Sequence, residues 1–233
     1  MFDRVTIRDA DFRRATFDAV APEGCVFERC DFRGQTLDRP YQSLFSSRRQ
    51  SVFRDCRFDD ADLTGVRPGQ ARFERCSFAN ARLDGWESYR AEFIDCVFAG
   101  RIANVRFFGR PWGNGAEILE PARKKNEFRG NDFRGADLVG VTFVHGIDIA
   151  AQRWPESPDY IVLDKIHQRI ASARREVLEW REHPAREEAL DMLQSAAQLY
   201  THQMTVIGRR VEARWSAPAA VQRRVWETLA KAV

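Results

Sequence analysis

The sequence contains no long apolar run and no excess of one charge. No stretch of the 233 residues approaches the apolar length of a membrane span, and the start Met1-Phe2-Asp3-Arg4 lacks a signal-peptide hydrophobic region. We therefore expect a cytoplasmic protein without a membrane segment. Lys and Arg number 37 against 34 Asp and Glu, a net charge of +3. This near balance argues against a basic nucleic-acid footprint, so direct nucleic-acid binding is not expected.

Signals of catalysis are also missing. The four histidines are scattered, and none stands in an evident relay with Asp, Ser or Cys. No phosphate-binding glycine loop, zinc-ligand spacing or nucleophile elbow is present. The cysteines are few and odd in number, which argues against a disulfide framework. We expect no enzyme activity, no cofactor and no metal. The cysteines are Cys25, Cys30, Cys56, Cys76 and Cys96.

What the sequence does contain is a large apolar side chain at every fifth residue. A period of five matches neither the 3.6 of a helix nor the 2 of a strand, so it indicates a repeat architecture. We call these recurring positions centres. They are Ile7, Phe12, Phe17, Phe27, Phe32, Leu37, Phe53, Phe58, Leu63, Phe73, Phe78, Leu83, Phe93, Phe98, Phe128, Phe133, Leu138 and Phe143.

A small residue, Ala or Cys, usually stands two residues before each centre, and the other three positions are mostly polar. Centre and small residue are expected to point inward. The order Phe-Phe-Leu recurs at 53, 58 and 63 and again at 73, 78 and 83, one cycle of 20 residues. Four pentapeptides therefore make one coil.

Three segments carry a family resemblance. Residues 61–65, 81–85 and 136–140 read Ala-Asp-Leu-Thr-Gly, Ala-Arg-Leu-Asp-Gly and Ala-Asp-Leu-Val-Gly. They resemble the pentapeptide repeat family, with its A(D/N)LxX consensus, over roughly residues 5–145. The resemblance implies a mainly β fold, a right-handed quadrilateral parallel β-helix, here with about six coils. We expect this domain to span residues 1–150.

Stacked coils place equivalent residues in ladders. Cys30, Cys56, Cys76 and Cys96 are expected one above another, each a coil from the next. Thiols along a line cannot form a tetrahedral metal site, so we interpret them as buried packing residues. On the first face the charges alternate in sign, as at Arg8, Glu28, Arg54 and Glu74, and should pair between coils.

The third face carries the one candidate acidic surface. Its aspartates form a predicted stripe, interrupted mainly by Arg39 and Arg82. The members of this acidic stripe are Asp18, Asp38, Asp62, Asp84 and Asp137.

The repeat breaks at residues 38–50 and 109–125, and loops of this length are often functional. We interpret both insertions as candidate partner-binding loops. The alternative is that their apolar side chains, such as Trp112 and Ile118, only anchor the loops on the rod. The candidate partner-binding residues are Tyr41, Leu44, Phe45, Arg48, Arg49, Trp112, Asn114, Ile118 and Leu119.

After Trp154-Pro155 the period becomes helical, so residues 155–233 are predicted to form an α-helical domain. Two seams of apolar residues, separated at His183-Pro184, predict an antiparallel hairpin of two helices of about 20 to 25 residues each. A third helix is predicted after Pro218. We expect the hairpin to form a homodimer, with packing inside one chain as the alternative. The seam residues are Leu163, Ile166, Ile170, Val177, Trp180, Leu190, Leu193, Tyr200, Met204, Ile207 and Val211.

Apolar residues are expected at outward positions of the last coils, where the insertion, the helices or a partner would cover them. They are Ile94, Val97, Ile102, Val105, Phe107 and Val139.

The leading functional hypothesis is a non-enzymatic protein that presents the loops and faces of a β-helical rod to a protein partner. The alternative follows from the family resemblance. Its quinolone-resistance members modulate DNA gyrase, dimerise through a C-terminal helical element, carry two loops and imitate DNA with an acidic surface. That alternative implies DNA gyrase or topoisomerase IV as the partner, and a role in antibiotic resistance. A second alternative is a scaffold subunit of a larger bacterial assembly, bound through the apolar outward positions.

Overall fold

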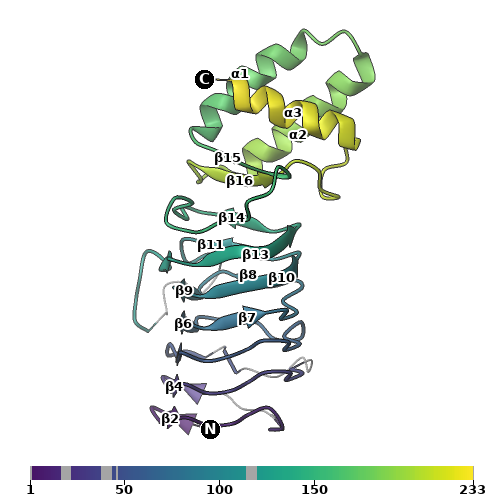
Figure 1. Ribbon diagram of the computed structural model, residues 1–233. Helices are drawn as coiled ribbons and strands as arrows, with labels where there is room; N and C mark the ends of the chain where they lie inside the picture. The colour runs from purple at the N-terminus through teal and green to yellow at the C-terminus, as the bar shows by residue number, and fades with distance from the viewer. Residues whose placement is uncertain (1, 17–21, 38–43, 46, 114–119, 233) are drawn as a thin grey trace. The chain divides into compact units, whose positions relative to one another are not determined.

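A computed structural model of the chain describes residues 2–16, 22–37, 44–45, 47–113 and 120–232 (Figure 1). The chain divides into two compact units. The first comprises Met1–Thr142 with Ala150–Pro155, and the second comprises Phe143–Ile149 with Glu156–Val233. Each unit has its own core. No helix in the described part of the chain combines the length and the apolar character that crossing a bilayer requires.

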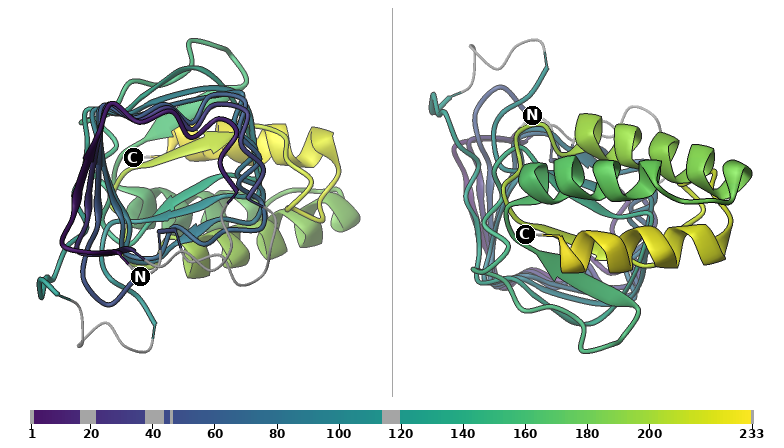
Figure 2. Two further views of the ribbon diagram at one scale, coloured as in Figure 1. Left: turned by 90° about the horizontal axis from the view of Figure 1, so that it is seen from below. Right: turned by 90° about the horizontal axis from the view of Figure 1, so that it is seen from above.

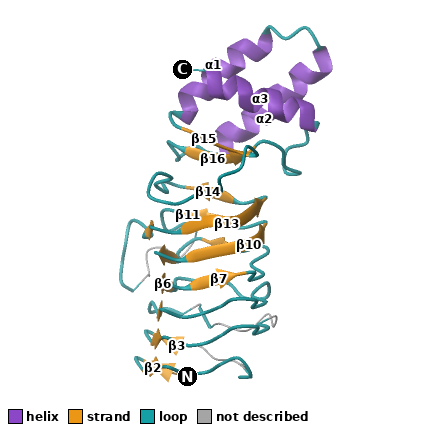
Figure 3. Cartoon of the chain, viewed as in Figure 1, coloured by secondary structure: helices purple, strands orange, loops and turns teal. Residues whose placement is uncertain are grey.

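The first unit is a β-helix of short parallel strands, and most of each coil is drawn as loop between them (Figure 3). Seen from below, its coils superpose on a square outline (left panel of Figure 2). The strands are β1 (Phe2–Asp3), β2 (Thr6–Arg8), β3 (Pro22–Glu23), β4 (Val26–Glu28), β5 (Val52–Arg54), β6 (Arg72–Glu74), β7 (Ser77–Ala79), β8 (Glu87–Ser88), β9 (Glu92–Ile94), β10 (Val97–Ala103), β11 (Arg106–Phe108), β12 (Phe128–Arg129), β13 (Asp132–Val139) and β14 (Thr142–Val144), which continues into the second unit.

Strand register confirms the coil period. The largest sheet has the order β12-β9-β6-β5-β4-β2. Its parallel pairs place the first-face centres Ile7, Phe27, Phe53, Phe73, Phe93 and Phe128 in one ladder. The other sheets of this unit pair β1 with β3, β10 with β7 and β13, and β11 with β8. Equivalent residues of successive coils therefore lie side by side, as the 20-residue cycle predicts.

Stacked aromatic rings fill the interior. On the second face the ring centroids are 4.7 Å apart for Phe12 and Phe32 and 4.6 Å apart for Phe98 and Phe133. Trp154 continues this stack, with its ring 5.1 Å from that of Phe133. Each buried Phe contributes about 1.5–3 kcal/mol of transfer free energy. The ring stacks are the main source of stability in this unit.

The corner after the first face is turned by residues with left-handed backbone. Asp9, Arg29, Asp55, Arg75 and Asp95 have φ between 51° and 55°. A non-glycine residue in this conformation costs about 1–3 kcal/mol. The same residues pair between coils, with Arg29 Nε 2.7 Å from Asp9 Oδ1 and Arg75 Nε 2.7 Å from Asp55 Oδ1. Hydrogen bonds from Arg29 hold the pKa of Asp9 below its ordinary value.

The predicted charge alternation of the first face is confirmed. Arg54 lies between two carboxylates, with Nη1 3.1 Å from Glu28 Oε1 and Nε 2.8 Å from Glu74 Oε2. Arg8 pairs with the other oxygen of Glu28 at 2.6 Å. This face neutralises its own charge between coils, so little of its charge is left for a ligand.

The cysteines are buried free thiols, as predicted. Their sulfurs donate to main-chain carbonyls of the interior; Cys76 Sγ, for example, lies 3.2 Å from the oxygen of Phe53. Burial raises the pKa of the Cys76 thiol well above its ordinary value. Among the described residues, no group of three or more His, Cys, Asp or Glu side chains is placed to hold a metal ion.

The prediction that apolar residues face outward in the last coils is wrong for three of the six. Ile102, Val105 and Phe107 are buried in the interior, whereas Ile94 stands in register with the outward Glu74 and is buried as a covered outward residue. Within β10 the step from Phe98 to Ile102, which pairs with Leu138, is four residues instead of five, and this shortening returns the later residues to inward positions. Val139 is half-buried, and Val97 remains exposed at 46%.

The second unit combines three helices with a two-stranded antiparallel sheet. The strands are β15 (Tyr160–Leu163) and β16 (Val206–Arg209), and the helices are α1 (Ile166–Leu178), α2 (His183–Leu199) and α3 (Ala219–Lys231). The three helices pack against one another (right panel of Figure 2). α2 begins at the predicted break, with Pro184 in its first turn, where no intrahelical N–H is required.

The predicted helix through Val211 is wrong beyond Leu199. A turn follows, in which Gln203 Nε2 donates to the carbonyls of Thr205 and Ile147, and Val206 then starts a strand. Leu163, predicted to open the first helix, lies in β15 opposite Val206. The ambiguity is physical, because short apolar runs fit a strand as well as a helix.

Most residues of the two apolar seams are buried inside one chain. Leu190 and Val211 are half-buried, and Met204 is exposed at 68%. This burial contradicts the predicted use of the seams as a dimer interface, because side chains already packed on α1, α2 and α3 are not available to a second copy. The buried seam residues are Leu163, Ile166, Ile170, Val177, Trp180, Leu193, Tyr200 and Ile207.

A ring deletion tests the stacked core. Phe73 is fully buried, and its ring contacts those of Phe53 and Phe93 at centroid distances of 5.4 and 5.1 Å. We expect Phe73→Ala to lower the free energy of unfolding by about 3–5 kcal/mol, measured by urea denaturation. The exposed Val97→Ala is the control, with an expected loss of about 0.5 kcal/mol. Equal losses in the two variants would contradict the assignment of the core.

Candidate functional site

The two insertions meet, although they lie far apart in the sequence. The Gln50 amide donates to the carbonyl of Glu120 at 2.8 Å, and Arg49 forms an isolated β-bridge with Glu120. The Glu120 carboxylate pairs with Arg49 Nε at 2.9 Å and with Arg48 Nη2 at 3.2 Å. We call this contact the insertion clasp. Hydrogen bonds from Arg49 hold the pKa of Glu120 below its ordinary value.

The first insertion is also fastened to the rod. The backbone amides of Arg48 and Arg49 donate to the two carboxylate oxygens of Glu23 at 3.1 and 2.9 Å. Gln70 Nε2 donates to the carbonyl of Ser47 at 2.8 Å. The two arginines are thus held at a defined place on the surface.

Two predicted partner-binding residues are instead part of the core. Leu44 and Phe45 are each 1% exposed. The ring of Phe45 lies edge-on to those of Phe53 and Phe73, with centroids 5.1 and 5.3 Å apart. The insertion interrupts a coil, and these side chains fill the interior space that a regular pentapeptide would occupy. The prediction that they contact a partner is wrong.

A buried polar network lies beneath the insertions. The carboxylate of Glu92 is 3% exposed and accepts from Gln50 Nε2 at 2.8 Å, Arg72 Nη1 at 3.1 Å and the Glu127 amide at 2.9 Å. A buried carboxylate without such donors would cost several kcal/mol. Glu92 therefore ties the first insertion, the rod and the end of the second insertion together.

Arg123 anchors the end of the second insertion. Its side chain is largely buried, and its Nε lies 3.6 Å from Glu92 Oε1. Its Nη2 donates to the carbonyl of Arg90. Burial lowers the pKa of Arg123, with Glu92 acting in the opposite direction. Because burial disfavours the charged form of Arg123, its positive charge depends on the nearby carboxylate of Glu92.

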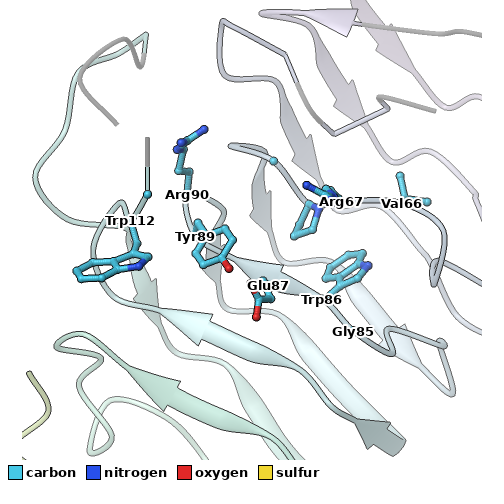
Figure 4. Close-up of a pocket in the computed structure, with 11 residues that line it drawn as sticks. Val66, Arg67, Gly85, Trp86, Glu87, Tyr89, Arg90 and Trp112 are labelled. Atoms are coloured by element: carbon cyan, nitrogen blue, oxygen red, sulfur yellow. The ribbon is translucent and has the colours of Figure 1, made fainter. Parts of the chain in front are cut away.

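A surface pocket of about 660 Å³ opens beside the second insertion. Figure 4 shows Trp112 and Tyr89 toward one end of the pocket and Trp86 and Arg67 toward the other. All lining residues belong to the first unit. They are Val66, Arg67, Pro68, Gly69, Gly85, Trp86, Glu87, Tyr89, Arg90, Trp112 and Gly113.

Hydrogen bonds and ring contacts hold the wall of the pocket. Trp86 is buried and donates from Nε1 to the carbonyl of Leu63 at 2.9 Å. The Trp112 amide donates to the carbonyl of Tyr89 at 3.1 Å, and the Tyr89 ring lies 4.7 Å from that of Phe108. The side chain of Trp112 remains 48% exposed at the rim. The wall is thus formed before any ligand binds.

The candidate site contains some of the predicted residues and several that sequence reasoning missed. Arg48, Arg49 and Trp112 lie on it, whereas Tyr41, Asn114, Ile118 and Leu119 lie outside the described residues. The missed residues come from regular coils, where the available signal was the pair of aromatic residues Trp86 and Tyr89, three positions apart in the sequence. They are Val66, Arg67, Trp86, Glu87, Tyr89 and Arg90.

The acidic stripe is broken by arginine where the structure describes it. Asp62 pairs with Arg82 of the next coil, and Asp137 stands in register with Arg101. Asp84 is half-buried. Asp18 and Asp38 lie outside the described residues. No uninterrupted row of carboxylates forms among the members that are described.

Comparison with known families identifies the repeat. The family model described as pentapeptide repeats (8 copies) matches residues 51–85. These residues of the chain are pentapeptide repeats. The matched residues include part of the pocket lining, from Val66 to Gly69 and Gly85, whereas both insertions lie outside the match.

Solved structures give a distant likeness. Full-length QnrB1, a plasmid-mediated fluoroquinolone resistance protein, is 16% identical, with a TM-score of 0.28 over 65% of this chain and 80% of that one. A trypsin-treated variant of QnrB1 is 18% identical, with a TM-score of 0.24 over 66% and 79% of the two chains. No curated protein matches the chain. Likeness at this level transfers neither a partner nor a mechanism to this chain.

Removing the buried cation tests the anchoring of the second insertion. We expect Arg123→Met to lower the free energy of unfolding by about 2 kcal/mol, because Glu92 keeps Arg72 but loses a second cation. Hydrogen exchange of residues 120–126 should become faster. Lys124→Met, an exposed neighbour, is the control and should change stability by less than about 0.5 kcal/mol. Unchanged exchange in Arg123→Met would refute the anchor.

Proposed function

We propose that this chain is a non-enzymatic interaction protein that binds a protein partner with the face carrying the two insertions. The observation that carries the proposal is the insertion clasp, in which Glu120 pairs with Arg48 and Arg49 beside a preformed pocket. Elsewhere, stacked rings fill the rod and paired charges cover its first face. The insertions therefore offer a distinctive surface on a rigid support.

The chemistry of the face suits recognition of a protein. Trp and Arg are enriched at the centres of protein interfaces, and this face presents the half-exposed Trp112, with Arg90 among the residues that line the same pocket. A preformed wall reduces the ordering cost of binding. We propose further that the β-helix is right-handed with about six coils and that the protein acts in the cytoplasm.

Site-specific photocrosslinking tests the proposal. A benzophenone amino acid placed at Arg48 or Trp112, in the organism that makes the protein, should form a covalent adduct with one protein species. The control position is Arg134, an exposed residue of β13 on the second face. Adducts of equal yield at all three positions, or none at Arg48 and Trp112, would exclude this face as the interaction surface.

Modulation of DNA gyrase or topoisomerase IV remains the alternative function, because it follows from the resemblance of the repeats. Its DNA-mimicry form receives less support, since Arg82 and Arg101 interrupt the acidic stripe. The scaffold alternative loses its basis, because most of the apolar residues that it required are buried.

A supercoiling assay decides the gyrase alternative. If gyrase is the partner, micromolar protein should inhibit supercoiling or protect gyrase from a fluoroquinolone. Asp62→Asn with Asp84→Asn would then test the acidic stripe, and Arg48→Ala with Arg49→Ala would test the insertion clasp. If neither inhibition nor protection occurs, gyrase is not the partner.

A further inference from the structure

Two polar side chains of the rod lie beneath both insertions. They are Gln70 and Glu92, and each is 3% exposed. Both belong to regular coils and not to the insertions at residues 38–50 and 109–125. A buried polar side chain is costly unless its donors and acceptors are bonded. The groups that bond these two side chains are therefore held in place with them.

Gln70 uses the two ends of its amide group for different insertions. Its Nε2 donates to the carbonyls of Ser47, at 2.8 Å, and Arg48 in the first insertion. Its Oε1 lies 3.5 Å from Arg123 Nη1 of the second insertion, which donates to it. Because the amide is planar and rigid, a displacement of one insertion moves the group that is offered to the other.

The carboxylate of Glu92 is divided in the same way. Its Oε2 accepts from Gln50 Nε2 of the first insertion at 2.8 Å. Its Oε1 accepts from the amide of Glu127, just after the second insertion, at 2.9 Å, and lies 3.6 Å from Arg123 Nε. Release of either insertion would leave a buried charge with fewer donors, so each insertion is stabilised by the presence of the other.

The bonds at the base of the second insertion extend to the rim of the pocket. The amide of Asn126 donates to the carbonyl of Gly109 at 3.0 Å, which closes this insertion. The carbonyl of Tyr89 accepts from Asn126 Nδ2 and from the Trp112 amide, each at 3.1 Å. Trp112 is thus held by the same segment that the two buried side chains fasten to the first insertion.

We infer that the two insertions form one cooperative unit, coupled by Gln70 and Glu92, so that a partner which fixes either insertion also fixes the other. Gln70 and Glu92 are positioning residues, since both are buried beneath the surface that a partner would contact. This inference rests on the proposed function for the partner and adds its regulation, because a coupling between two binding segments acts equally in both directions.

Hydrogen exchange of the full chain, followed by NMR for single amides, tests the coupling. The amide of Asn126 reports on the second insertion, and the amides of Arg48 and Arg49, whose acceptor lies on the rod, report on the first. We expect Gln50→Ala to accelerate exchange of the Asn126 amide about tenfold. Arg123→Met should accelerate exchange of the Arg48 and Arg49 amides by a similar factor. In each case the substitution lies in the other insertion.

Two further variants are the controls. Glu28→Gln alters a carboxylate of the same face that pairs with Arg8 and Arg54 of neighbouring coils, and it should change none of the three amides. Glu120→Gln weakens the insertion clasp at the surface and keeps both buried side chains. It should leave the exchange rate of the Asn126 amide within about twofold of the wild-type rate.

Three results would overturn the inference. The first is faster exchange only in the insertion that carries the substitution. The second is equal acceleration of the Phe58 amide, which donates to the carbonyl of Ser77 in the rod, because the insertions would then open only with the whole unit. The third is an effect of Glu120→Gln on Asn126 equal to that of Gln50→Ala, which would place the coupling in the insertion clasp.

The coupling and the proposed function can fail separately. Coupled exchange without crosslinks at Arg48 and Trp112 would leave the coupling standing and remove the proposed function. Crosslinks at both positions without coupled exchange would leave the proposed function standing and remove the coupling.

Discussion

Parallel stacking of equivalent residues is the constraint on which the first unit depends. Main-chain hydrogen bonds hold neighbouring coils at about 4.8 Å, which is close to the separation of stacked aromatic rings. Ring centroids on the second face are 4.6 to 5.1 Å apart, so one spacing satisfies both the backbone and the side chains. The same kind of residue must therefore return at each inward position. Rings and thiols then fill the interior, and any partner must bind outside.

The outer faces of the first unit differ in how their charged side chains are paired. On the first face Arg29, Arg54 and Arg75 pair with carboxylates of neighbouring coils, and this pairing recurs with the period of the backbone. Where the insertions interrupt the repeat, the regular pairing of arginines with carboxylates from coil to coil ends. A buried network around Glu92 replaces it, because a carboxylate at 3% exposure requires donors from several segments at once. The irregular part of the rod is thus held by specific polar contacts and presents the least repetitive surface.

The second unit buries its apolar residues in a different way. Its apolar seams are narrow, and a two-helix hairpin would leave them partly open. Addition of α3 and of the β15–β16 pair closes them within one chain. Trp226 of α3 packs against Gly208, where an added Cβ would lie 2.3 Å from the indole. A close fit of this kind explains how the seams are satisfied without a second copy.

The sequence by itself determined the features that depend only on the five-residue period. Centres every fifth residue predict the Phe ladders, the buried line of thiols and the alternating charges, because each residue contacts its equivalent one coil away. Contacts outside that period were decided only by the tertiary structure. It placed Leu44 and Phe45 inside and brought Glu120 to Arg49. It also turned Val206–Arg209 into a strand opposite β15. Residues in a break have no ladder partner to specify their direction, so the space left by distant segments decides it.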